Sequence, residues 1–307
     1  MKLALYTHRA CLEHDPGRGH PESPERLAAV IEALQLAHPG SEWHEAPAAT
    51  RSQLARVHDD TMIASVLDAP IHGLQRLDAD TAMSAQSPEA ALRAVGAAIA
   101  AVDALIAGET QRAFCATRPP GHHATQDTSM GFCLFNNVAV AAAHALEQHG
   151  LARVAIADFD VHHGNGTQDI FAADPRVLYL SSHQSPLYPG TGAAAEHGVG
   201  NIVNAPLPPR SGSGAFRAAW TQQLLPAIDA FRPQLLLISA GFDAHRLDPL
   251  ADLNLEADDY AWITHELCAL ADRHAQGRVV SLLEGGYSLT ALRECSVAHV
   301  GALLADA

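Results

Sequence analysis

The chain has 307 residues, a formal net charge of −15 and a hydrophobic content of 48%, and no apolar run is long enough to cross a membrane. The acidic balance argues against nucleic acid as a partner, because binding to phosphate needs basic patches. It would suit cationic partners such as lysine-rich peptides or polyamines. The five cysteines are scattered and form no C-x-x-C pair, so they support neither a zinc ribbon nor a disulfide framework, and we expect a reducing, cytoplasmic setting.

Continuous apolar runs predict six buried strands, in chain order 3–6, 113–116, 154–159, 177–182, 235–240 and 279–283. Runs of this kind are typical of parallel strands that are covered on both faces. Helical patterns with capping residues and terminal glycines predict helices over 87–107, 136–149, 214–230, 256–275 and 288–304. No repeat or linker divides the chain, so we expect one domain over residues 1–307, with a three-layer α/β/α fold around a mostly parallel sheet.

Unusual polar segments follow four of these strands. They read RPPGHHATQDTSMGF, DVHHGNGTQDIF, GFDAH and EGGY. Ligands of open parallel sheets bind beyond the carboxyl ends of the strands, so we expect the four segments to converge on one rim.

Two of these segments contain potential metal ligands. Asp160 and His162 are two residues apart and point the same way along an extended strand end. With Asp243 they would make the three protein ligands of a catalytic zinc site, although Fe²⁺, Co²⁺ or Mn²⁺ would also suit them. The simpler alternatives are a solvated polar loop for the first pair and a turn residue or helix N-cap for Asp243.

The other two segments contain candidate catalytic groups. His122 and His123 follow two rigid prolines and could be metal ligands, or a general base and its electrostatic partner. Tyr287 follows two glycines and could donate a hydrogen bond to an oxyanion. Incidental histidines and an ordinary half-buried tyrosine are the alternatives. Nucleophilic catalysis by Cys133 is a minor option, because no oriented base is evident.

Six ordered motifs, RPPGHHA, GFCLFNNVA, DFDVHHGNGTQDIF, SSHQSPLYPGTG, SAGFDAH and LEGGY, together with HPESPERL at residues 20–27, resemble the zinc-dependent histone deacetylase superfamily. The resemblance implies the arginase/deacetylase fold. It implies Zn²⁺ bound by Asp160, His162 and Asp243, the active-site histidines His122 and His123, the oxyanion donor Tyr287, and Asp158 as the acid that orients His122.

Asn165 stands where some members of the family have an aspartate, and the HHGNG sequence is class II-like. The resemblance therefore implies that His123 lacks a carboxylate partner and serves as a neutral general base. It also implies a structural K⁺ site that includes Asp158, Asp160, His162, Ser181 and Ser182. A peripheral cation is expected near Phe171, Asp174 and Val177.

The resemblance further implies an acyl-lysine tunnel walled by Phe132 and Tyr188, with Gly131 beside them. Asp78 and Asp80 are expected in a rim loop. Polyamine-selective relatives place an acid seven residues past the third metal ligand, and Leu250 stands there instead. This favours removal of acetyl groups from lysine in proteins or peptides, and the deacetylation of small acetylated polyamines is the alternative.

Two rival functions lie outside this reading. A metal-free binding module would be expected to lack at least one of the three metal ligands or Tyr287, and this sequence keeps all four residues. A ureohydrolase of the arginase branch would need a second set of aspartate and histidine ligands around two Mn²⁺ ions, which GFDAH does not supply.

Overall fold

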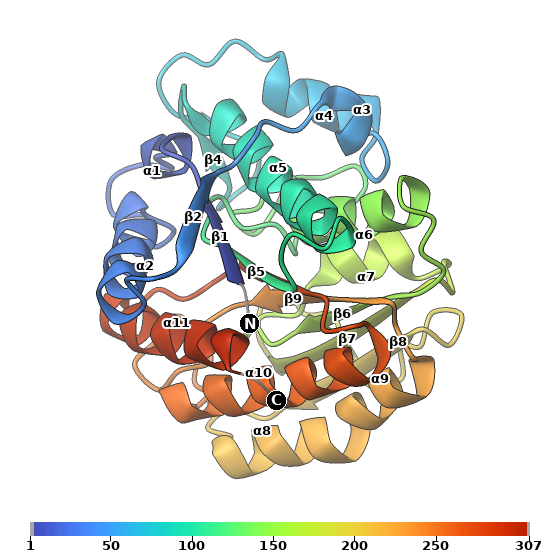
Figure 1. Ribbon diagram of the computed structural model, residues 1–307. Coiled ribbons are helices and arrows are strands. Elements are labelled where there is room, and N and C mark those ends of the chain that lie inside the picture. The colour runs from blue at the N-terminus through green and yellow to red at the C-terminus, as the bar shows by residue number, and fades with distance from the viewer. Residues whose placement is uncertain (1–2, 306–307) are drawn as a thin grey trace.

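An eight-stranded parallel sheet runs through the centre of the molecule, with helices on both faces (Figure 1). The computed structural model describes residues 3–305. The strands follow the spatial order β2-β1-β5-β10-β9-β6-β7-β8. Their bounds are β1 Leu3–Thr7, β2 Glu42–Glu45, β5 Arg112–Cys115, β6 Val154–Asp158, β7 Val177–Gln184, β8 Ile202–Leu207, β9 Leu235–Ala240 and β10 Val279–Leu283. Every pairing within this sheet is parallel, which confirms the predicted fold class.

The six predicted strands form the six inner positions of the sheet, whereas both edge strands were missed. The edge strand β2 has no fully buried residue, and β8 contains Pro206. Proline is tolerated at a sheet edge because its missing N–H leaves no inner ladder bond unmade. A separate two-stranded antiparallel sheet pairs β3 (Gln75–Arg76) with β4 (Ala82–Met83).

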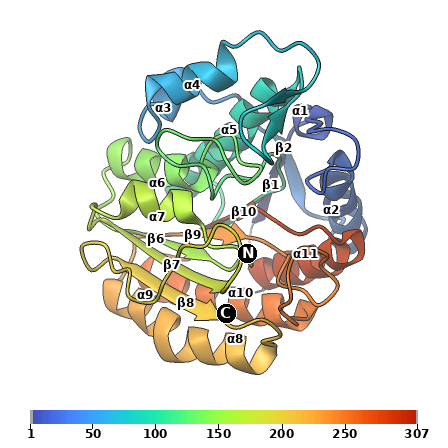
Figure 2. The same cartoon turned by 180° about the vertical axis from the view of Figure 1, so that it is seen from behind.

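Helices cover the sheet as two layers, and Figure 2 shows them from behind. The helix bounds are α1 Ala10–Glu13, α2 Pro24–Ala37, α3 Arg51–Leu54, α4 Asp60–Leu67, α5 Ser87–Ile106, α6 Asn137–Glu147, α7 Asn165–Phe171, α8 Ser213–Ala219, α9 Leu225–Phe231, α10 Ala257–His274 and α11 Leu289–Leu304. No helix among residues 3–305 is long and apolar enough to span a membrane.

Each face of the sheet has its own hydrophobic core. Leu235 and Leu237 of β9 pack into one core with α5 and α6, while Leu236 and Ile238 pack into the other with α2, α10 and α11. Side chains alternate between the faces of a strand, so a strand buried on both sides is apolar at every position. This is why the continuous apolar runs predicted the inner strands correctly.

The predicted helix over 214–230 is interrupted. A π-helical turn, Trp220–Leu224, separates α8 from α9. The Trp220 side chain is fully buried there, and its indole N–H donates to Ser182 Oγ at 3.0 Å. The wider turn therefore ties this helical layer to the end of β7, a feature that helical periodicity alone does not indicate.

Candidate active site

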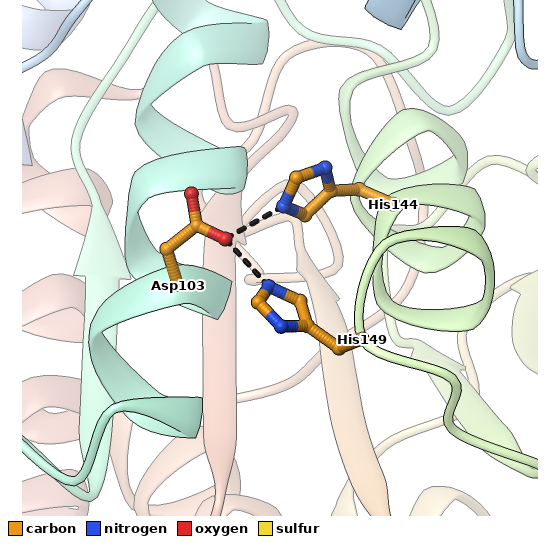
Figure 3. A group of neighbouring side chains, drawn as sticks. All are labelled: Asp103, His144 and His149. Atoms are coloured by element: carbon orange, nitrogen blue, oxygen red, sulfur yellow. Dashed lines mark hydrogen bonds and ion pairs between the residues drawn. The ribbon is translucent and has the colours of Figure 1, made fainter.

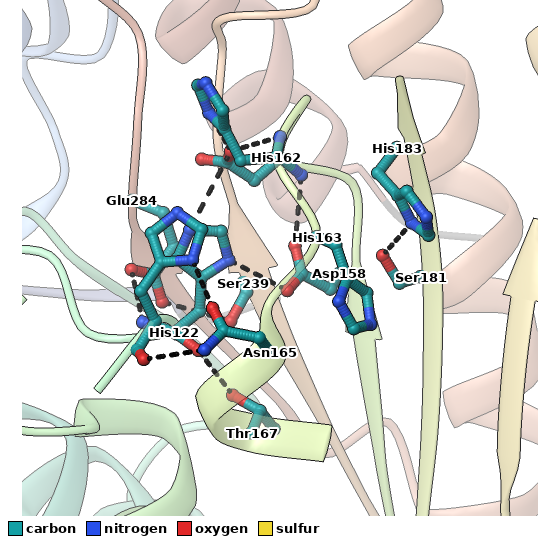
Figure 4. A network of polar contacts seen from close by, with 12 residues as sticks. His122, Asp158, His162, His163, Asn165, Thr167, Ser181, His183, Ser239 and Glu284 are labelled. Atoms are coloured by element: carbon teal, nitrogen blue, oxygen red, sulfur yellow. Dashed lines mark hydrogen bonds and ion pairs between the residues drawn. The ribbon is translucent and has the colours of Figure 1, made fainter. Parts of the chain in front are cut away.

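The four polar segments converge, as predicted, because β5, β10, β9 and β6 are consecutive neighbours in the sheet. All four strands run in the same direction, so their carboxyl ends share one rim. Figure 4 shows the resulting polar network.

Asp160, His162 and Asp243 form a buried cluster of three potential ligand atoms. His162 Nδ1 lies 3.2 Å from Asp160 Oδ1 and 3.2 Å from Asp243 Oδ2. A tetrahedral ion with bonds of about 2.0–2.1 Å separates its ligand atoms by about 3.3 Å, so this spacing suits such an ion. Burial, and after it the charge of Asp160, raises the pKa of Asp243. The donor set therefore fits a divalent cation with nitrogen and oxygen ligands.

Two glycines let the backbone approach these carboxylates. A Cβ at Gly241 would lie 2.0 Å from Asp160 Oδ2, and one at Gly285 would lie 2.1 Å from Asp243 Oδ2. The N–H of Gly285 donates to Asp160 Oδ2 at 2.8 Å. Any larger residue at either position would displace one of these two carboxylates.

His122 is held by the carboxylate of Asp158, as predicted. Its Nδ1 lies 3.0 Å from Asp158 Oδ2, and the hydroxyl of Tyr179 donates to the same oxygen at 3.0 Å. Burial opposes the charged form of His122, but the charges of Asp160 and Asp158 outweigh burial and raise the pKa of His122 to about 10. His122 is therefore suited to carry a proton.

His123, unlike His122, is held in its neutral form. Its Nδ1 lies 2.8 Å from Asn165 Oδ1, while Asn165 Nδ2 donates to the His123 carbonyl at 3.3 Å. This second bond requires the amide oxygen to face the ring, so Nδ1 carries the proton and Nε2 keeps a lone pair. Burial, together with the charges of His122 and His162, holds the pKa of His123 well below its usual range. His123 is thus a neutral acceptor.

A cavity of about 230 Å³ lies over this cluster, and His123, His162 and Tyr287 form part of its wall. The four residues predicted to bind substrate, Gly131, Phe132, Tyr188 and Leu250, all line the cavity, and Asp80 and Leu187 complete it. Gly131 and Phe132 both have positive φ values, of 56° and 69°. A Cβ at Gly131 would fall 2.5 Å from His123 Cδ2, so this strained turn lets the wall lie directly against the imidazole of His123.

Tyr287 is held by two residues that sequence reasoning did not assign to the site. The Arg26 guanidinium lies 4.8 Å from the centre of the Tyr287 ring, and Asp248 Oδ2 accepts the Tyr287 N–H at 2.7 Å. Burial raises the pKa of Tyr287 well above its usual value, although Arg26 opposes this shift, so the phenol keeps its proton.

The HPESPERL motif supplies Arg26, which explains a segment that the sequence left without a role. Arg26 donates to the carbonyl oxygens of Gly286 and Glu284, at 2.5 and 2.6 Å. It also pairs with Glu22, which in turn binds Arg118 at the start of the histidine turn. The spacing of Glu22 and Arg26, four residues apart at a helix start, was the available signal.

The residues of the predicted K⁺ site lie together at the ends of β6 and β7. Asp158 pairs with Ser181 in the sheet register, Ser182 follows, and Asp160 and His162 continue the chain from β6. Potassium binding itself stays a prediction.

The expected peripheral cation cradle is already filled by a side chain. The carbonyl oxygens of Phe171, Asp174 and Val177 converge, but all three accept from Asn201 Nδ2, at 2.8, 3.0 and 2.8 Å. The amide nitrogen stands where a cation would have to bind, so the geometry does not support the expected ion there.

A second aspartate–histidine cluster lies near the surface, between α5 and the end of α6 (Figure 3). Asp103 Oδ1 is 2.6 Å from His144 Nε2 and 2.6 Å from His149 Nε2. Arg56 Nη1 lies 2.7 Å from His144 Nδ1. A guanidinium only donates, so Nδ1 of His144 accepts and its Nε2 carries the proton. That nitrogen has no lone pair for a metal, and sequence reasoning did not single out this cluster.

Comparisons with known proteins place the chain in a family. The histone deacetylase domain matches residues 20–303. A histone deacetylase-like amidohydrolase of Pseudomonas aeruginosa is 40% identical, over 92% of this chain and 76% of the relative. Histone deacetylase 14, chloroplastic, of Arabidopsis thaliana is 38% identical, over 98% of this chain and 77% of the relative. The crystal structure of the HDA15 HD domain superposes with a TM-score of 0.94 and 36% identity, covering 99% of this chain and 88% of that one. The chain belongs to the histone deacetylase family.

Proposed function

We propose that the protein is a zinc-dependent amidohydrolase that removes acetyl groups from the Nε of lysine in proteins or peptides. The observation that carries this proposal is that a two-carboxylate, one-imidazole cluster, a neutral histidine and a protonated tyrosine meet at one cavity, which His162, His123 and Tyr287 line. Membership of a family that includes an amidohydrolase-like relative supports the hydrolase class.

Zn²⁺ would be held by Asp160, His162 and Asp243. When bound, it would supply Lewis acidity that polarises the amide carbonyl and acidifies water. The remaining chemistry belongs to the side chains around it.

His123 Nε2 accepts the proton of the attacking water. Its low pKa keeps the ring neutral before the reaction, and Nδ1 is engaged by Asn165, so the free lone pair lies on Nε2. Tyr287 donates a hydrogen bond to the oxygen that becomes negative as the amide carbon turns tetrahedral. His122, charged and held by Asp158, stabilises that negative charge. The leaving amine then takes its proton from a protonated histidine of this pair.

The cavity favours a substrate with an unbranched alkyl stem. Phe132 and Tyr188 provide apolar walls for such a stem, and Leu250 contributes a further apolar side chain. An acetylated lysine projecting from a peptide suits this shape, because the peptide backbone would stay outside the cavity.

Acetylated polyamines are the second candidate, because one wall of the cavity is acidic. Asp80 lines it, and burial, followed by the neighbouring Asp78, raises the pKa of Asp80. The raised pKa weakens its negative charge, but Asp80 still places a carboxyl group in the cavity wall, where it would attract the distal ammonium of a bound polyamine. The lysine reading stays preferred because Leu250 occupies the position of the acidic residue of polyamine-selective relatives.

The geometry gives less support to a two-metal ureohydrolase. His245, the second potential ligand in GFDAH, is buried away from the cluster, with its Nε2 3.5 Å from Glu256 and its Nδ1 accepting from Leu247. A metal-free binding module is disfavoured because every ligand and Tyr287 are in place.

The decisive experiment compares turnover of an acetyl-lysine peptide with that of acetylputrescine and acetylspermidine, using zinc-loaded protein. We expect faster turnover of the peptide. In parallel, Leu250→Glu should shift the preference toward the polyamines, because it adds a carboxylate to the cavity wall. Faster polyamine turnover by the unaltered protein would overturn the lysine reading, and no acetate release from any of the three would overturn the function.

We also propose a cytoplasmic location. The five cysteines are all free and buried, as suits a reducing compartment.

A further inference from the structure

Glu284 is a fully buried acid that directly follows β10 and precedes Gly285 and Gly286. It is neither a predicted metal ligand nor part of the cavity wall. Figure 4 shows it behind His122, next to Ser239. A buried carboxyl group at this depth needs partners, and its partners indicate its role.

The carboxylate binds the backbone of the histidine turn. Glu284 Oε2 accepts the N–H of Gly121 at 2.6 Å and the N–H of His122 at 3.2 Å, while Oε1 accepts from the Ser239 hydroxyl at 3.0 Å. Two successive backbone N–H groups aimed at one oxygen form an anion-binding nest, and such charge-assisted bonds are stronger than neutral ones. This oxygen therefore helps to fix the backbone at His122, together with the N–H of Thr167, which donates to the His122 carbonyl at 3.2 Å.

The opposite side of the turn is closed by packing. A Cβ at Gly121 would lie 2.5 Å from the backbone nitrogen of Asn137, and Asn137 Nδ2 donates to the Pro119 carbonyl at 3.1 Å. The turn is thus confined between the start of α6 and Glu284.

Glu284 also connects this turn to the tyrosine. Its own backbone carbonyl accepts from Arg26 Nη2, and the Arg26 guanidinium lies over the Tyr287 ring. One residue thus contacts the backbone of the histidines through its side chain and the support of Tyr287 through its main chain.

The hydrogen bonds do not require a full negative charge. Burial raises the pKa of Glu284 to about 7, against the opposing effects of His122 and the Gly121 N–H. A protonated carboxyl group still offers an oxygen that accepts hydrogen bonds. A glutamine could therefore do the same, with its amide N–H₂ facing the Ser239 hydroxyl.

We propose that Glu284 is a positioning residue that holds the Gly121–His123 turn, and with it both imidazoles, in register with the reacting carbonyl. The inference rests on the proposed function and deepens it, since it concerns the geometry of the same histidines.

The test compares two substitutions of similar size, Glu284→Gln and Glu284→Met, with Ser239→Ala as the matched control. The methionine removes the acceptor, so we expect kcat on the acetyl-lysine peptide to fall about 10- to 100-fold, with KM within twofold and zinc content unchanged. The glutamine should restore kcat to within about fivefold of the unaltered protein. Ser239→Ala should change kcat less than the methionine, because the nest on Oε2 remains.

A second readout does not depend on turnover. In ¹H–¹⁵N spectra the amide protons of Gly121 and His122 should move upfield in Glu284→Met and stay in place in Glu284→Gln, as expected when a strong acceptor is lost or kept. If the methionine variant does not fold, the glutamine variant alone decides: retained kcat and amide shifts support the proposal, and loss of both overturns it.

Full kcat in a folded Glu284→Met variant, or equal losses in the two variants, would also overturn the proposal. If the unaltered protein released acetate from neither peptide nor polyamine, the proposed function would fail, and the amide shifts would still decide whether Glu284 holds the turn.

Discussion

Among residues 3–305, two clusters of aspartate and histidine offer three potential metal-ligand atoms each, and they differ in almost every physical respect. In the cluster at the sheet rim, His162 Nδ1 stands 3.2 Å from two buried carboxylates. In the surface cluster, one oxygen of Asp103, whose side chain is 48% exposed, lies 2.6 Å from each of two imidazoles. The first spacing suits ligands around an ion, and the second is that of hydrogen bonds.

The neighbours of each cluster explain the difference. Glycines and backbone N–H groups surround Asp160 and Asp243. None of these groups carries a positive charge, so the negative charge of the two carboxylates is available to bind a cation. Beside His144, Arg56 supplies a positive charge and a donor that keeps the proton on the wrong nitrogen for metal binding. Residue types alone would not separate these clusters, because their environment decides what they can bind.

The largest expected effect is at the rim cluster. Asp243→Ala should lose both the metal and activity, since one of three protein ligands is removed. Asp103→Ala should keep one metal ion per chain and full activity, and cost about 1 kcal/mol or less of stability because the Asp103 side chain is itself half exposed. Metal analysis measures the metal content of both variants, acetate release measures their activity, and urea unfolding measures the stability of Asp103→Ala. Loss of metal in Asp103→Ala would contradict the distinction between the clusters.

Tyr287→Phe tests the hydrogen bond to the oxyanion, for which the surface cluster has no counterpart. We expect kcat to fall about 100- to 1,000-fold, as for removal of one oxyanion donor, with the metal retained because the phenol is not a ligand. Steady-state kinetics together with metal analysis checks this. Full activity in the folded variant would show that another group serves the oxyanion.

Asn165→Asp would give His123 the kind of carboxylate partner that Asp103 gives the surface imidazoles. A negative charge at this position favours the imidazolium, so the low pKa of His123 should rise. A general base works only when neutral, so the acidic limb of the pH profile of kcat/KM should move to higher pH. Asp103→Asn is the control and should leave the profile where it is. A shift to lower pH in Asn165→Asp would rule out His123 as the base.

The smallest effect is expected from converting the surface cluster. Arg56→Met would free His144 Nδ1 to carry the proton and Nε2 to bind a metal, so a weak second divalent ion should become measurable by isothermal titration. The unaltered protein should bind one ion under the same conditions. A second ion in the unaltered protein would mean that Arg56 does not block the site.

The sequence predicted the parts of the structure whose causes are local. The inner strands are apolar at every position, and Asp160 and His162 are close in the chain, so short windows reveal them. The edge strands were missed because Glu42–Glu45 is half exposed and Ile202–Leu207 contains a proline. The roles of Arg26 and Asp248 were not predicted, because no local sequence pattern indicates contacts between distant residues. Asp248 binds Tyr287 from 39 residues away, and Arg26 binds Gly286 from 260 residues away.

The contacts of Arg26 have a consequence for how the protein is made. Arg26 is joined to carbonyls at Glu284 and Gly286, so the candidate active site is closed by some of the most distant pairings among the described residues. Contacts of such long sequence separation tend to form late in folding. On the ribosome, the tyrosine could reach its place only after β10 had been synthesised and inserted between β5 and β9. The proposed activity of a nascent or truncated chain would therefore appear only after Tyr287, which follows β10, has been synthesised and placed, so acetate release would report completed folding.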